Sequence, residues 1–96
     1  MTAKEWKARV AQGACVMCRH LDLLQLGRTH LHHAREGQGL SQRASDWLVI
    51  GLCQEHHQGK TGWHGLGKMG FYGKNKLDEF DLLAMTIAQT LKGIIP

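Results

Sequence analysis

"LCQEHHQGKTGWHG", residues Leu52 to Gly65, places one cysteine and three histidines within fourteen positions. Cys53 and His56 are spaced C-x2-H, which suits a pair of Zn²⁺ ligands at the start of a helix. His57 follows directly, and adjacent side chains on a helix point about 100° apart. His56 and His57 therefore cannot easily bind the same small ion, and the sequence predicts two metal sites.

Partners for the first site stand upstream, where Cys15 and Cys18 are spaced C-x2-C. Together with Cys53 and His56 they supply four ligands in two chelating pairs, which suits a closed, tetrahedral structural Zn²⁺. Three cysteines are an odd number, and in the reducing compartment that we expect they do not indicate a disulfide framework. The alternative is three buried apolar cysteines beside a solvated His56.

Ligands for the second site must come from the other histidines. A dense group in one short segment consists of His30, His32 and His33. His64 follows His57 in "GWHG", where the flanking glycines let the backbone bend its side chain inward. If the upstream segment is a strand, His30 lies on the same face as His32 and is a reserve ligand or an outer group.

Length and composition limit what else the chain can be. Its 96 residues form one domain, and chains this short often rely on a bound metal for stability. No apolar run approaches the ~20 residues of a membrane span, so a soluble protein with no membrane partner is expected. The N-terminal "MTAKEWKARVAQ" lacks a signal-peptide pattern, which favours the cytoplasm. The net charge of +4 favours a polyanionic partner.

The two ends of the chain are predicted to be packing helices. Residues 1–12 carry Ala3, Trp6 and Val10 at helical spacing. Residues 66–96 are expected to form the C-terminal helices, one of which has a broad apolar stripe and ends at Gly93. The stripe consists of Phe80, Leu83, Ala84, Ile87 and Leu91.

The middle of the chain, residues 13–65, is predicted to hold the zinc knuckle and a hairpin. Residues 28–33 and 46–52 are short and rich in apolar or β-branched side chains, as strands are. A polar stretch too long for a tight turn separates them, and a short helix is expected from Cys53 until Gly59 and Gly62. The predicted fold class is therefore α+β, with a small zinc core flanked by helices.

This order of motifs resembles the HNH endonucleases, whose ββα-metal core is built on a treble-clef zinc finger. The resemblance rests on the C-x2-C knuckle, a strand ending in a histidine doublet, a second strand running into "LC", and a helix beginning C-x2-H-H. "HHQGKTGWHG" followed by "LGKMGFYGKNKLDEFDLL" is similar to small phage nucleases related to the Ref recombination-enhancement nuclease. The resemblance covers roughly residues 13 to 83.

The resemblance implies a metal-dependent endonuclease that hydrolyses DNA phosphodiester bonds and leaves 5′-phosphate and 3′-hydroxyl ends. It makes His33 the general base, and His32, His57 and His64 the ligands of one catalytic ion. Mg²⁺, Mn²⁺, Ni²⁺ and Zn²⁺ are the candidate ions, of which imidazole ligands favour the transition metals. It also implies a phage setting in a host cytoplasm, with recombination or replication proteins as further partners.

One position departs from the family pattern. The family has an asparagine shortly before "LC", whereas position 48 here is Leu48 and the only asparagine is Asn75. Asp46 is the nearest polar substitute, because a carboxylate that accepts a hydrogen bond from one ring nitrogen of His33 would fix its tautomer. The alternative is that Asp46 is a solvated charge at a loop or strand edge.

Cations around the central segment are predicted to contact phosphates. They are Arg28, Arg35, Arg43 and Lys60. No base-reading helix is evident, so nicking with weak sequence preference is expected. The alternative function is a non-catalytic treble-clef zinc module that binds nucleic acid or a protein partner, and an open coordination position at the second site separates the two readings.

Overall fold

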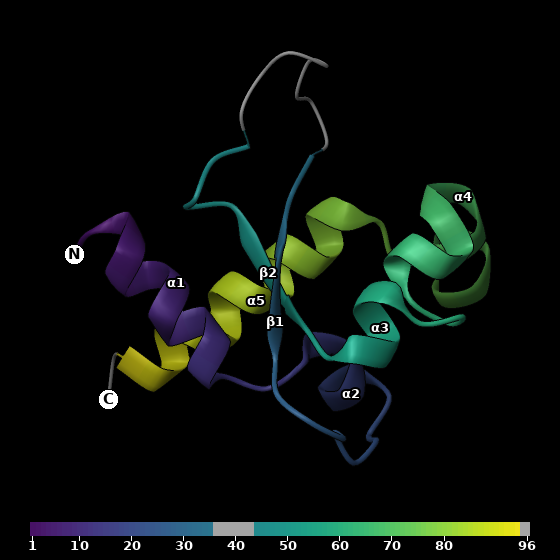
Figure 1. The fold of residues 1–96 in the computed structure, drawn as a ribbon, viewed down its shortest axis with the longest axis horizontal. Helices are drawn as coiled ribbons and strands as arrows, with labels where there is room; N and C mark the ends of the chain where they lie inside the picture. The colour runs from purple at the N-terminus through teal and green to yellow at the C-terminus, as the bar shows by residue number, and fades with distance from the viewer. Residues whose placement is uncertain (36–43, 95–96) are drawn as a thin grey trace.

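The computed structural model describes residues 1–35 and 44–94, and they form a small α+β domain, which confirms the predicted class (Figure 1). Arg43 lies outside the described residues. The elements follow in the order α1 (Ala3–Gln12), α2 (Val16–His20), β1 (His30–His33), β2 (Val49–Leu52), α3 (Gln54–Gln58), α4 (Trp63–Asn75) and α5 (Glu79–Ile94). No helix in this part of the chain is long and apolar enough to cross a membrane.

The two strands pair antiparallel, with His30 opposite Leu52 and His33 opposite Val49. Both are shorter than predicted, and just before β1 the hydroxyl of Thr29 donates to the carbonyl of Gly13 at 2.6 Å. Successive side chains of a strand point to opposite faces. The histidines of β1 are thereby divided between two sides of the hairpin.

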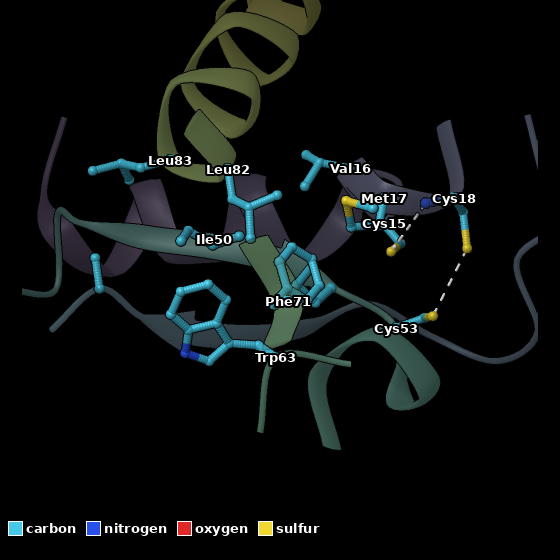
Figure 2. Close-up of a cluster of buried hydrophobic side chains, with 12 residues drawn as sticks. Cys15, Val16, Met17, Cys18, Ile50, Cys53, Trp63, Phe71, Leu82 and Leu83 are labelled. Carbon is cyan, nitrogen blue, oxygen red and sulfur yellow. Dashed lines mark hydrogen bonds between the residues drawn. The ribbon is translucent and has the colours of Figure 1, made fainter. Parts of the chain in front are cut away.

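Each side of the hairpin is covered by different helices. On one side, α1 packs Trp6 and Val10 against Val49 and the partly buried Leu31. On the other side, α3 contacts both strands near the end of the hairpin where α2 also lies, and α4 packs against α3 (Figure 1). Figure 2 shows buried side chains of α2, α4 and α5 meeting around Ile50 of β2. His32 therefore faces α3 and α4, whereas His33 faces the side of α1.

The predicted apolar stripe of α5 is only partly right: Leu83 is buried and Ile87 packs against the core, but the other members are exposed. Phe80 and Leu91 are 57% and 41% exposed, while Leu82, Thr86 and Thr90 are buried. Thr86 can be buried because its hydroxyl donates to the carbonyl of Leu82 at 2.9 Å and accepts from the Gly51 amide at 3.4 Å. Apolar periodicity in the sequence does not identify a buried helix face that contains threonines. The predicted stop at Gly93 is also wrong, since α5 continues to Ile94.

Two candidate metal centres

The three cysteines and His56 meet in one buried cluster. Cys15 is the N-cap of α2 and Cys18 lies in its first turn, whereas Cys53 is the N-cap of α3 and His56 lies one turn on. Their ligand atoms all lie within 4.8 Å of one another. All four side chains are at most 7% exposed. The cluster is thus closed on every side, as structural zinc sites are.

The spacing of these atoms matches a Zn²⁺ tetrahedron. Metal–sulfur bonds of about 2.3 Å and metal–nitrogen bonds of about 2.0 Å imply sulfur–sulfur edges of about 3.8 Å and sulfur–nitrogen edges of about 3.5 Å. The Sγ atoms of Cys18 and Cys53 are 3.8 Å apart, as the dashed line in Figure 2 marks. The three sulfur atoms lie 3.5, 3.5 and 3.3 Å from Nδ1 of His56. The residues therefore fit a structural metal such as zinc.

Without a bound cation, burial keeps this cluster uncharged. Burial raises the pKa of the Cys15 thiol, and burial together with the neighbouring thiols raises that of Cys18 to about 12. Burial also lowers the pKa of His56, which keeps the imidazole neutral. Thiols packed this closely stay protonated by themselves, whereas a coordinated dication deprotonates them. Metal binding here should release protons.

A second cluster contains His32 of β1, His57 of α3 and His64 of α4. One ring nitrogen of each lies within 4.8 Å of the others. The ring centroids are 5.3 Å apart for His32 and His57, 5.1 Å for His32 and His64, and 4.9 Å for His57 and His64. His32 is buried, His57 is half-buried and His64 is exposed, so this cluster is open to solvent on one side.

His30 stands beside this cluster and does not join it. Its ring contacts the edge of the His57 ring at 5.7 Å, but its nitrogens are not grouped with the other three. Among the described residues, the second cluster therefore offers three imidazoles that could bind an ion, and it has an open side. Three protein ligands plus an open position are the usual arrangement of a catalytic metal.

One ring nitrogen of His57, Nδ1, is buried without a hydrogen bond to any partner within residues 1–35 and 44–94. Burial, and after it the neighbouring rings of His32 and His64, lowers the pKa of His57 to about 4. Burial lowers the pKa of His32 as well, against the opposing effect of Glu79. Neutral, close-packed imidazoles with an orphaned nitrogen fit a bound cation.

Acid should destabilise the protein through His57. Because its pKa in the folded state lies below the ordinary value of about 6.5, the unfolded chain takes up the proton first. The stability that the neutral ring contributes is complete above about pH 6.5 and is lost as the pH falls toward 4. We expect the unfolding temperature of wild type, loaded with zinc only at the cysteine site, to fall more steeply below pH 6.5 than that of His57→Gln. Equal slopes would contradict the prediction.

Two glycines let α4 approach α3 closely enough to bring His64 to His57. A Cβ on Gly62 would collide with the carbonyl oxygen of Glu55, and one on Gly65 with the carbonyl oxygen of Gly59. No side chain can replace hydrogen at these points without moving the backbone. The glycines noticed in the sequence thus serve packing between two helices.

Gly65→Ala should therefore damage both stability and the second site. We expect a loss of more than about 1 kcal/mol in the free energy of unfolding, with weaker binding of the second ion, because α4 must move away from α3. Gly73→Ala is the matched control in the same helix, since a Cβ there meets open space. It should stabilise the helix by roughly 0.5–1 kcal/mol. Denaturant unfolding and metal titration of both variants measure the difference.

His33 is held on the opposite side of β1. Its Nε2 lies 2.9 Å from Oδ1 of Asp46, and Oδ2 of Asp46 lies 3.4 Å from Nζ of Lys7 in α1. The hydrogen bond from His33, and next that from Lys7, lowers the pKa of the Asp46 carboxyl. Asp46 thus contacts His33 rather than standing as a solvated charge, and Lys7 is a partner that the sequence did not reveal.

Glu79 is the second residue that the sequence did not reveal. It begins α5 and is 3% exposed, and its Oε2 lies 2.7 Å from Nε2 of the equally buried His32. An acidic residue in the first turn of a helix is ordinary, because it complements the helix dipole. His32 and Glu79 are 47 positions apart in the sequence and offered no spacing from which to predict the contact.

The predicted phosphate-binding cations lie at the surface where the structure describes them. Arg28, Arg35 and Lys60 are exposed, and Arg43 lies outside the described residues. The backbone amide of Arg35 donates to Oε1 of Glu79 at 2.6 Å, which fixes the chain just after the histidine doublet. The backbone of Arg35 is thus held in place two residues after His33.

Comparisons with known proteins give no match. No protein-family model, curated protein or solved structure matches the chain. What the two centres do must be argued from their own residues.

Proposed function

We propose that this protein is a metal-dependent endonuclease of the HNH type, with a treble-clef zinc core. One observation carries the proposal. Two adjacent residues of β1 face opposite sides, with His32 in the open three-histidine cluster and His33 bound to Asp46. A purely structural zinc module would need the buried cysteine cluster, but it has no use for an open imidazole site next to an oriented histidine.

In the proposed reaction, His33 acts as the general base. Asp46 accepts a hydrogen bond from Nε2 of His33, which leaves Nδ1 as the nitrogen that takes the proton from an attacking water. His33 is the last residue of β1 and its side chain is 35% exposed, so a phosphate can reach it. Lys7 holds the second oxygen of Asp46 and so keeps the carboxylate charged and oriented.

His32, His57 and His64 would hold the catalytic ion. A divalent ion held there would supply Lewis-acid stabilisation of the charge that develops on the phosphate and its leaving oxygen. The three imidazoles bind it when neutral, and the buried face formed by His32 keeps water from that side. With the base opposite, the products carry 5′-phosphate and 3′-hydroxyl ends.

The proposed substrate is DNA. The net charge of +4 and the exposed Arg28, Arg35 and Lys60 favour a polyanion, and contacts to phosphate position a strand without reading its sequence. Weak sequence preference and steep loss of binding with added salt are the consequences. The phage setting and any recombination or replication partner follow from the HNH resemblance alone.

Plasmid cleavage tests the proposal. Protein that retains zinc in the cysteine cluster is incubated with supercoiled plasmid and Mg²⁺, Mn²⁺, Ni²⁺ or Zn²⁺ in turn. We expect nicking with at least one added ion, none without, and ends that accept a kinase label only after phosphatase treatment. Folded protein that binds DNA yet cleaves with none of these ions would replace the proposal with a non-catalytic zinc module.

A further inference from the structure

A buried carboxylate touches the three-histidine cluster from behind. Glu79 of α5 and His32 of β1 are 3% and 5% exposed, and they meet at 2.7 Å between Oε2 and Nε2. The other oxygen of Glu79 accepts the backbone amide of Arg35 at 2.6 Å. A carboxylate so far from solvent is costly unless it is bonded, and both of its oxygens are.

The contact decides which nitrogen of His32 carries the proton. An ionised carboxylate only accepts hydrogen bonds, so Nε2 must be the protonated nitrogen when it faces Glu79. The lone pair is then on Nδ1. Nε2 is already taken by Glu79, so Nδ1 is the nitrogen left for the cluster with His57 and His64.

We infer that Glu79 is a positioning residue of the second metal site, which fixes the tautomer and orientation of His32 so that Nδ1 is presented to the ion. The inference rests on the proposed metal site at His32, His57 and His64. A carboxylate behind a ligating imidazole fixes the ring and raises its basicity. Without it, a buried ring can place its proton on Nδ1, where it excludes a cation.

The geometry ties this role to the fold as well. Glu79 joins the start of α5 to β1 at two points, the ring of His32 and the backbone just after the doublet. A competing explanation is therefore that Glu79 only docks α5 on the hairpin. The two explanations differ in what happens to the ion and to the tautomer when the fold is intact.

The test compares wild type with Glu79→Gln and Asp81→Asn. Asp81 is an exposed acid in the same first turn of α5, and its contacts are to Asp78, so Asp81→Asn removes an equal charge without touching His32. Each protein is loaded with zinc at the cysteine cluster and titrated with Co²⁺, with thermal unfolding as the check on folding. Nitrogen NMR reports which ring nitrogen of His32 is protonated.

We expect Glu79→Gln to lower the affinity of the three-histidine site for Co²⁺ by about 10–100-fold, while the zinc of the cysteine cluster stays bound. Asp81→Asn should bind the second ion like wild type, and wild-type His32 should be protonated on Nε2 with and without the ion. Equal second-ion affinity in wild type and Glu79→Gln, or a wild-type His32 protonated on Nδ1, would overturn this inference alone. A wild type that binds no second ion would overturn the proposed site together with it.

Discussion

Cys53→Ser should leave the chain without a cooperative thermal unfolding transition. Serine does not replace a thiolate as a ligand, and Cys53 links the end of β2 to α3 within the buried cluster. Structural zinc contributes roughly 10–16 kcal/mol of apparent binding energy in small zinc domains, as much as or more than the roughly 5–15 kcal/mol of a typical domain's net stability. Circular dichroism on heating measures the loss, and chelation of wild type should reproduce it.

The control is a substitution of His20, in the same helix as Cys18. His20 ends α2, is exposed and takes no part in the cluster, so His20→Gln should unfold at the temperature of wild type. If Cys53→Ser or chelated wild type kept the wild-type unfolding temperature, the cluster would be packed thiols rather than a metal site. That is the alternative which the sequence left open.

His33→Ala should reduce DNA cleavage by about 10²–10⁴-fold, the usual contribution of a general base. It should leave both ions bound, because His33 points away from the three-histidine cluster toward Asp46. The rate of nicking at saturating metal measures the loss. Unchanged nicking would remove His33 from the reaction.

Two variants of Asp46 test, in the same nicking assay, whether its hydrogen bond to His33 supports cleavage. Asp46→Asn keeps an oxygen that accepts the hydrogen bond from Nε2 of His33, whereas Asp46→Ala removes it. We expect Asp46→Asn to retain much more activity than Asp46→Ala, although it loses the ion pair with Lys7. Equal losses in the two variants would show that the hydrogen bond to His33 does not matter.

The pairing of the cysteine-cluster residues could be predicted from local spacing, whereas the set His32, His57 and His64 was implied by the resemblance. The C-x2-C pair and the C-x2-H pair each lie within one helical turn. The angle of about 100° between adjacent helical side chains assigns His56 and His57 to different sites. The alternation along β1 likewise separates His32 from His33. The structure groups the residues as these patterns indicate.

What the sequence did not reveal depends on contacts between distant segments. Glu79 and Lys7 reach the histidines from α5 and α1, and neither is marked by spacing. Part of the buried face of α5 was missed for a different reason, because Thr86 and Thr90 are polar residues that the core accommodates. An analysis of apolar periodicity detects only buried residues that are themselves apolar.

The central claim is that one short chain carries two metal sites, one closed and one open, to which α3 contributes His56 and His57 respectively. Native mass spectrometry of wild type and of His64→Ala tests it most directly, since His64 is exposed and belongs only to the open site. The account predicts two ions in wild type and one in His64→Ala, with the remaining ion released only when the protein unfolds. A single ion in wild type, or two in the variant, would contradict it.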